Sequence, residues 1–414
     1  MTFRVHSLAT LASLASLAVA CGGSHTGGSG NPVQAGTGGA SGTGGSSGGG
    51  ADGGGALACD PNAAIPCHLG MTEPCDGVVN SGYEGDEYCM KPPDQGWQIH
   101  VGPSDYTNPD ELAKWELPPG AGDVNWCYEM KAPNDQVEYT SAYYSHMRPG
   151  SHHFILFALG ADAPDSTGPG DCSQRDGGFL GGASFTAGAT RNVQDAAMFG
   201  SAPEDQGMAG EVAPRQQYSA NLHFVNVGDQ DLVQELWVNN ISFPADQVVK
   251  KVKAIEWLGG LAMSVPPGAH QTVTAGPSFS GGICSPGEAD TRILGVTAHM
   301  HASTVRLSMY KQAPSDAQRQ LVFEDYNWEE PTVFRYNSEL KNPPPDAAAK
   351  TPGSMFSGVL LAQPGESYTW ECEVVNNRSV SLTFSDKAYD GEMCNVFGMY
   401  STPTAPAPWT CLSP

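Results

Sequence analysis

Short apolar runs separated by turn-forming residues most restrict how this chain can fold. From residue 57 onward, runs rich in Val, Phe, Tyr and Thr alternate with turn signals such as PPG, PGE and NPD, and helical periodicity is poor. The candidate strands are 152–159, 219–227, 234–243, 293–311, 320–326 and 393–401. Many short strands at close spacing predict β-sandwiches, and this stretch is too long for one of them. We therefore expect an all-β fold with two tandem jelly-roll-like β-sandwich domains, 57–247 and 248–414.

The first 56 residues are not expected to join either core. Residues 1–21 combine Arg4, an apolar Ala- and Leu-rich run and small residues before Cys21, which predicts an export signal peptide rather than a spanning helix. The end of this segment, LAVAC, resembles a bacterial lipobox, which implies lipid attachment to the Cys21 thiol; a plain secreted protein is the alternative. Residues 22–56, mostly Gly, Ser, Thr and Ala, predict a disordered tether.

The charge of the chain bears on its partners. The formal net charge is −24, and the 20 basic residues are not clustered, which argues against a nucleic-acid partner. No later segment reaches the roughly 18 consecutive apolar residues of a membrane span. We expect a monomer that contacts the membrane only through its lipid, at the bacterial outer membrane or cell surface or in the periplasm.

The cysteines point to the same compartments. Ten remain beyond Cys21, and an even number in an exported chain indicates disulfides, because those compartments are oxidising. A zinc site is the alternative for the first four, Cys59, Cys67, Cys75 and Cys89. They are separated by seven, seven and thirteen residues, with no C-x₂-C pair, which disfavours zinc. We expect these four to pair among themselves.

The histidines within the candidate strands suggest a metal site. In GVTAHMHAS, His299 and His301 alternate, so a strand would place both on one face. In GSHHFILF, the neighbours His152 and His153 can reach one metal only if the strand twists or bulges there. A further histidine, His223, lies in ANLHFVNVGD, and its alternative role is a half-buried side chain bonded to a backbone carbonyl.

Near the C-terminus, DGEMCNVFGMY supplies Met393. A methionine in an apolar strand is often core filler, but a thioether beside two imidazoles suits Cu(I) better than Zn²⁺ or Mg²⁺.

In this order, the His-His pair, the single His, the H-x-H and the EMCN segment resemble the copper type II, ascorbate-dependent monooxygenases, the family of peptidylglycine α-hydroxylating monooxygenase and dopamine β-monooxygenase.

The resemblance implies two copper ions per chain, one on each domain, facing each other across a solvent cleft. It assigns His152, His153 and His223 to the copper that passes electrons. It assigns the catalytic residues His299, His301 and Met393 to the copper where O₂ hydroxylates an activated C–H of a small organic substrate, with a reductant such as ascorbate. The disulfides expected with it are Cys372–Cys394, Cys284–Cys411 and Cys127–Cys172.

Departures from the family pattern concern the substrate. Thr297 and Phe397 stand where the peptidylglycine enzymes carry an Arg and a Tyr that hold a carboxylate, whereas Asn395 matches the family. Arg306 lies at an odd offset from the H-x-H, so a regular strand would point it to the opposite face. We expect a neutral or aromatic substrate held by apolar contacts and by Asn395.

Two other functions remain open on the sequence. A non-catalytic copper-binding surface lipoprotein, for storage or delivery, would keep the same six ligands. An adhesive β-sandwich with accidental histidines is the third possibility, although accidental histidines do not usually fall in a family's order.

Overall fold

The computed structural model describes residues 75, 79–160, 165–166, 168–172, 184–189, 193–197, 202–276, 290–329, 331–338, 356, 358–385, 387, 389–404 and 409–413. All of them belong to one unit, Ala56–Pro414. The predicted signal peptide, the tether and the residues Cys21, Cys59, Cys67 and Cys284 lie outside the described residues. None of the described helices is long and apolar enough to cross a membrane.

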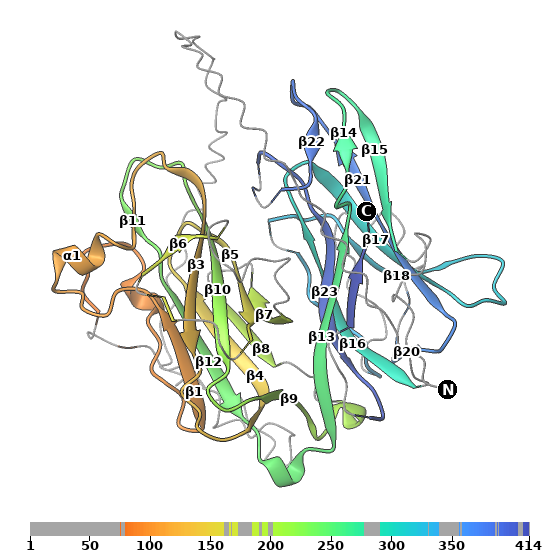
Figure 1. Ribbon diagram of the computed structural model, residues 1–414, viewed down its shortest axis with the longest axis horizontal. Helices are drawn as coiled ribbons and strands as arrows, with labels where there is room; N and C mark the ends of the chain where they lie inside the picture. Colours follow the sequence, from red (N-terminus) through yellow and green to blue (C-terminus); the bar gives the residue numbers. More distant parts are fainter. Residues whose placement is uncertain are drawn as a thin grey trace, which may run out of the picture. The chain divides into compact units, whose positions relative to one another are not determined.

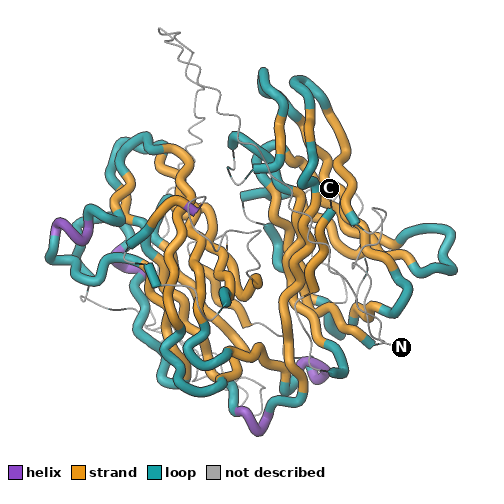
Figure 2. Tube along the Cα trace, viewed as in Figure 1, coloured by secondary structure: helices purple, strands orange, loops and turns teal. Residues whose placement is uncertain are grey.

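Strands make up nearly all the regular structure, which confirms the all-β prediction (Figure 2). In the first half of the unit, one layer contains β1 (Gly96–Val101), β12 (Leu236–Ser242), β4 (Glu138–Met147), β9 (Met208–Val212) and β8 (Val193–Ala197). The facing sheet contains β6 (Gly170–Asp171), β3 (Gly122–Lys131), β10 (Gln217–Asn226), β5 (Ser151–Ala158) and β7 (Ser184–Ala189).

The second half repeats this two-layer arrangement (Figure 1). One layer contains β13 (Lys250–Gly259), β23 (Cys394–Ser401), β16 (Thr291–Met300), β19 (Phe334–Arg335), β20 (Leu360–Ala362) and β24 (Trp409–Leu412). The facing sheet contains β15 (His270–Ala275), β21 (Ser367–Val375), β17 (Thr304–Gln312) and β18 (Gln320–Asp325). A parallel pairing of β9 with β13 joins the first layers of the two halves into one eleven-stranded sheet.

Short elements complete the described structure. Two small ribbons pair β2 (Glu116–Leu117) with β11 (Leu232–Val233) and β14 (Ser264–Val265) with β22 (Leu382–Thr383). The helical segments are α1 (Pro109–Leu112) and the 3₁₀ turns η2 (Asp86–Tyr88), η4 (Pro203–Asp205) and η5 (Ala245–Gln247). The turn η5 lies at the predicted domain boundary, directly before β13.

Each half has its own hydrophobic core between its two layers. Alternation along the strands produces these cores, because every second side chain points inward; Tyr368, Trp370, Cys372 and Val374 of β21 are all fully buried in this way. The first core draws on residues 97–238 and the second on residues 255–411. The apolar periodicity of the sequence thus builds two sandwiches.

One predicted strand was wrong. The run 293–311 is not continuous but forms β16 and β17, which belong to different sheets. The chain turns after His301, whose carbonyl accepts a hydrogen bond from the Thr304 N–H at 3.0 Å. Arg306 therefore lies on β17, where its guanidinium pairs with Glu373 at 3.0 Å and Glu324 at 3.6 Å. Its direction cannot be derived from its offset from the H-x-H, because the two do not share one regular strand.

The disulfides agree with the predicted pairs wherever both cysteines of a pair are described residues. Cys372–Cys394 and Cys127–Cys172 are both bonded as expected, and Cys75 bonds Cys89 within the first cluster. Cys411 is also disulfide-bonded. Its predicted partner lies outside the described residues. Several disulfides in one chain indicate folding in an oxidising compartment, and hence export.

Candidate metal centre

The first three histidines meet at a bulge. On β10, His223 pairs with His153 of β5, but the next residue, Phe224, pairs with Ser151, so His152 is an extra residue in β5. This bulge lets two sequence neighbours reach the same point, as the sequence required. The ring centroids are 5.0 Å apart for His152–His153, 5.0 Å for His152–His223 and 4.8 Å for His153–His223. One ligand atom from each ring lies within 4.8 Å of the others.

The second predicted set lies where β16 ends and β23 begins. His299 pairs with Asn395 and Met300 with Cys394, so the register places Met393 next, level with His301. The ring centroids of His299 and His301 are 5.6 Å apart.

Glu392 ties the two chain segments of this second set together. Its buried carboxylate accepts hydrogen bonds from the backbone N–H groups of His301 at 2.6 Å, Met393 at 2.9 Å and Ser303 at 3.1 Å. Burial raises the pKa of this carboxyl to about 7, against the effect of those bonds. The residue stands beside Met393 in the EMCN segment, but nothing in its spacing indicated this role.

The two predicted ligand sets contact each other. His153 and His299 have ring centroids 5.1 Å apart in an edge-to-face arrangement. The expected solvent cleft between the two sets does not separate these rings. The physical reason is apolar packing between the halves, in which Ile155 and Phe157 of β5 cluster with Leu258 and Phe397.

Burial keeps these imidazoles neutral. Desolvation, followed by the neighbouring rings, lowers the pKa of His299 to about 3 and lowers the pKa values of His153 and His301 well below their ordinary value. Neutral imidazole is the form that binds metals. His153, His299 and His301 can therefore each offer one unprotonated ring nitrogen to a metal at neutral pH.

His301 is the most informative of the five histidines in the two predicted ligand sets. It is only 1% exposed, yet neither of its ring nitrogens has a hydrogen-bond partner of normal geometry among the residues that the structure describes. The backbone of Gly391 is close enough to raise the pKa of the ring, but burial lowers it more. A buried polar group without a partner costs about 1–3 kcal/mol, so such a group calls for an explanation. A metal ion bound by the ring would provide one, and imidazoles beside a thioether are the donors that copper prefers.

Aromatic side chains enclose the cluster, and sequence analysis did not identify most of them. Trp328 packs against His152 at 5.1 Å between centroids, and Phe397 packs against His299 at 5.6 Å. Phe185 in turn stacks on Phe397 at 4.9 Å. Contacts between distant segments such as these leave no local pattern in a sequence.

A small cavity of about 40 Å³ lies beside His299 and is lined in part by Thr297 and Phe397. These are two of the positions where the family resemblance locates the substrate. The third, Asn395, is fully buried; its Oδ1 accepts a hydrogen bond from the Gly259 N–H at 3.1 Å, and its Nδ2 has no partner within the described part of the chain. The cavity has room for about one water molecule, whose share of liquid volume is ~30 Å³.

Comparison with known proteins adds little. No protein-family model and no curated protein matches this chain. A protein from Eubacterium rectale described as a putative secreted protein is similar at 10% identity and a TM-score of 0.20, over 75% of this chain and 70% of that one. The major capsid protein P2 of bacteriophage PM2 is similar at 7% identity and a TM-score of 0.31, over 75% of this chain and 100% of that one. Likenesses this low carry no functional argument.

Proposed function

We propose that this protein is an exported, copper-dependent monooxygenase that hydroxylates an activated C–H bond of a small organic substrate, using O₂ and a reductant such as ascorbate. The observation that carries the proposal is His301, a buried imidazole with two unpartnered nitrogens, inside a cluster of five histidines. The order of the ligands along the chain, which resembles the ascorbate-dependent copper monooxygenases, supplies the reaction class.

We assign roles to the residues by the family resemblance. His152, His153 and His223 would hold one copper, and His299, His301 and Met393 the other. Copper supplies the one-electron chemistry and the O₂ activation that amino-acid side chains lack. Glu392 fixes the backbone of two ligand residues. The aromatic rings of Trp328 and Phe397 pack against His152 and His299.

Copper stoichiometry tests the metal part of the proposal. We expect the full-length protein to bind two copper ions, measured by mass spectrometry of the metal after dialysis. His301→Ala should remove one ion and leave the other. The matched control is His270→Ala, because His270 is exposed on β15 and pairs with Glu373 at 2.6 Å. One ion in the wild type, or loss of both ions in His301→Ala, would contradict the two-site assignment.

Substrate preference tests the reaction. We expect ascorbate-driven oxygen uptake with hydroxylation of small aromatic amines or alcohols rather than of a glycine-extended peptide. The reason is that Thr297 and Phe397 offer no charged partner for a carboxylate, and such a hydrogen bond is worth ~1.5–3 kcal/mol. Efficient hydroxylation of the peptide that depends on its carboxylate would contradict this inference.

Copper storage or delivery is the second candidate. The small cavity beside His299, about 40 Å³, favours it, because an organic substrate needs more room than this unless the site opens. The two functions differ in one measurement. An enzyme forms one hydroxylated product per O₂ consumed, whereas a carrier transfers copper to a chelator without product.

We also propose that Cys21 carries a lipid that anchors the protein to the membrane. We expect Cys21→Ala to move the protein from the membrane fraction to the soluble fraction. An unchanged distribution would favour a plain secreted protein.

A further inference from the structure

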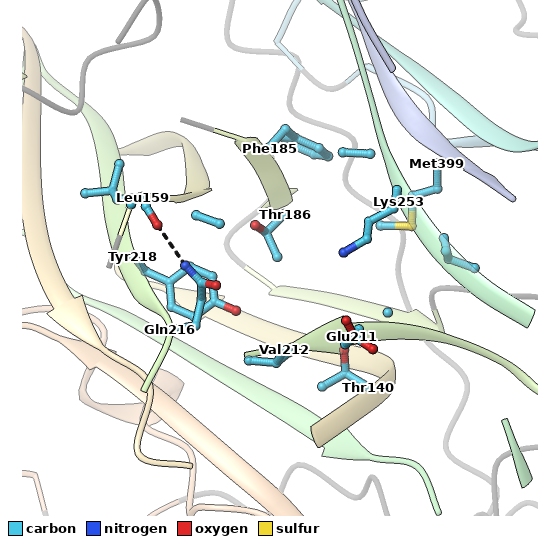
Figure 3. A pocket seen from close by; sticks show the side chains of 15 residues that line it. Thr140, Leu159, Phe185, Thr186, Glu211, Val212, Gln216, Tyr218, Lys253 and Met399 are labelled. Atoms are coloured by element: carbon cyan, nitrogen blue, oxygen red, sulfur yellow. Dashed lines mark hydrogen bonds between the residues drawn. The ribbon is translucent and has the colours of Figure 1, made fainter. Parts of the chain in front are cut away.

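A second, larger cavity lies apart from the histidines. It has a volume of about 390 Å³ and is lined by residues of both halves, from β4, β5, β7, β9, β10, β13 and β23 (Figure 3). Volumes of ~300–1,000 Å³ are typical of small-molecule sites. Phe185 lines both this cavity and the small one beside His299, so the two are neighbours.

Two charged residues among those described line this cavity, Glu211 and Lys253, and they are not paired with each other. Glu211 is already satisfied: it pairs with Lys251 and accepts a hydrogen bond from the Tyr139 hydroxyl at 3.2 Å, and the bond from Lys251 is the main cause of its lowered pKa. Lys253 projects into the cavity (Figure 3). Among the described residues its ammonium has no hydrogen-bond or ion-pair partner. It acts on Glu211 only at longer range.

This local positive charge is unusual for the chain. Among the described residues that line the cavity, Lys253 is the one basic residue and Glu211 the one acidic residue, and Lys251, outside the lining, already neutralises Glu211, in a protein with a formal net charge of −24. A general excess of acidic residues would not place a partly buried lysine without a partner in a cavity. The arrangement instead matches the requirement of a bound anion, since charge-assisted hydrogen bonds are the strong ones.

The rest of the lining is apolar with a few neutral polar groups. Leu159, Val212 and Met399 contribute apolar side chains, and Phe185 contributes an aromatic ring. Tyr218 is 2% exposed and reaches the cavity with its hydroxyl, which burial keeps protonated by raising its pKa. A few placed polar groups in an otherwise apolar wall are what orient a small organic ligand.

We propose that this cavity binds a small organic monocarboxylate with an apolar body, its carboxylate on Lys253 and its body against Leu159, Phe185 and Met399. The site is separate from the histidine cluster and does not rest on the proposed copper function. It therefore stands even if the substrate of that cluster is neutral.

The test compares an acid with its uncharged amide. We expect 4-phenylbutyrate to bind the full-length protein in isothermal titration calorimetry, and 4-phenylbutanamide to bind roughly tenfold more weakly or worse. Lys253→Met, which keeps the aliphatic stem of the side chain, should lower the affinity for 4-phenylbutyrate to that for 4-phenylbutanamide. The matched control is Lys250→Met on the same strand, because Lys250 is exposed and does not line the cavity; it should leave both affinities unchanged. Thr186→Phe, which fills the cavity, should abolish binding of both compounds.

Three results would overturn the proposal. The first is equal affinity for acid and amide, and the second is an unchanged affinity for the acid in Lys253→Met. The third is no binding of 4-phenylbutyrate by the wild type at millimolar concentration. Circular dichroism of each variant would show that the fold is retained.

Discussion

Removal of the Cys372–Cys394 disulfide should weaken copper binding as well as the fold, and a second disulfide offers a matched control. The bridge closes a loop of 22 residues, which corresponds to about 3 kcal/mol of lost chain entropy in the unfolded state. The Cys75–Cys89 bridge closes 14 residues, which also corresponds to about 3 kcal/mol. On loop length alone, the two double Cys→Ala variants should lose similar amounts of unfolding free energy.

The two bridges differ in what they hold. Cys394 follows Met393 directly and pairs across the strands with Met300, between His299 and His301. Cys75 and Cys89 pack in another cluster, with Met90 and Trp237, and neither cysteine adjoins a predicted copper ligand in the sequence. Loss of groups that support a metal ligand typically weakens metal affinity by about 10–100-fold, so we expect that loss only in the Cys372→Ala/Cys394→Ala variant.

The assay pairs two measurements on each variant. Urea denaturation followed by circular dichroism gives the loss of unfolding free energy, and competition with a Cu(I) chelator gives copper affinity. Equal copper affinities in the two double variants would refute the reasoning, because the bridge next to Met393 would then act on stability alone.

Three further predictions concern buried charges. Glu256→Gln should stabilise the protein at pH 7 and have little effect at pH 4. Burial raises the pKa of the Glu256 carboxyl in the folded state, so this group does not reduce the free energy of unfolding below its unfolded pKa, and it reduces that free energy as pH rises through its folded pKa. Urea midpoints measured across pH would show this. Glu392→Ala should leave three buried N–H groups without their acceptor and weaken copper binding, while Glu371→Ala on the exposed face of β21 should not, as chelator competition would show. Arg148→Met should cost about 3–5 kcal/mol of unfolding free energy, measured in urea, because it leaves Glu235 buried without the guanidinium that lies 2.6 Å away; Arg148→Met/Glu235→Gln should recover part of that loss.

Local patterns were enough to predict the strands that carry the first ligand set. The runs 152–159 and 219–227 correspond to β5 and β10, since alternation and turn residues act within a few positions along the chain. The run 293–311 shows where this reasoning fails. Its apolar pattern continues through His301, but the hydrogen bond from Thr304 that turns the chain depends on how β16 and β17 pack in two different sheets.

The sequence by itself determined the chemistry available to this protein: neighbouring and alternating histidines, a methionine beside a cysteine, and an even set of cysteines beyond Cys21. Only the tertiary structure decided how these groups meet. The contact between His153 and His299, the aromatic cover from Trp328 and the unpaired ammonium of Lys253 all arise between segments far apart in the chain. Such contacts depend on which faces of the two sandwiches pack together, and side-chain periodicity defines a face without naming its partner.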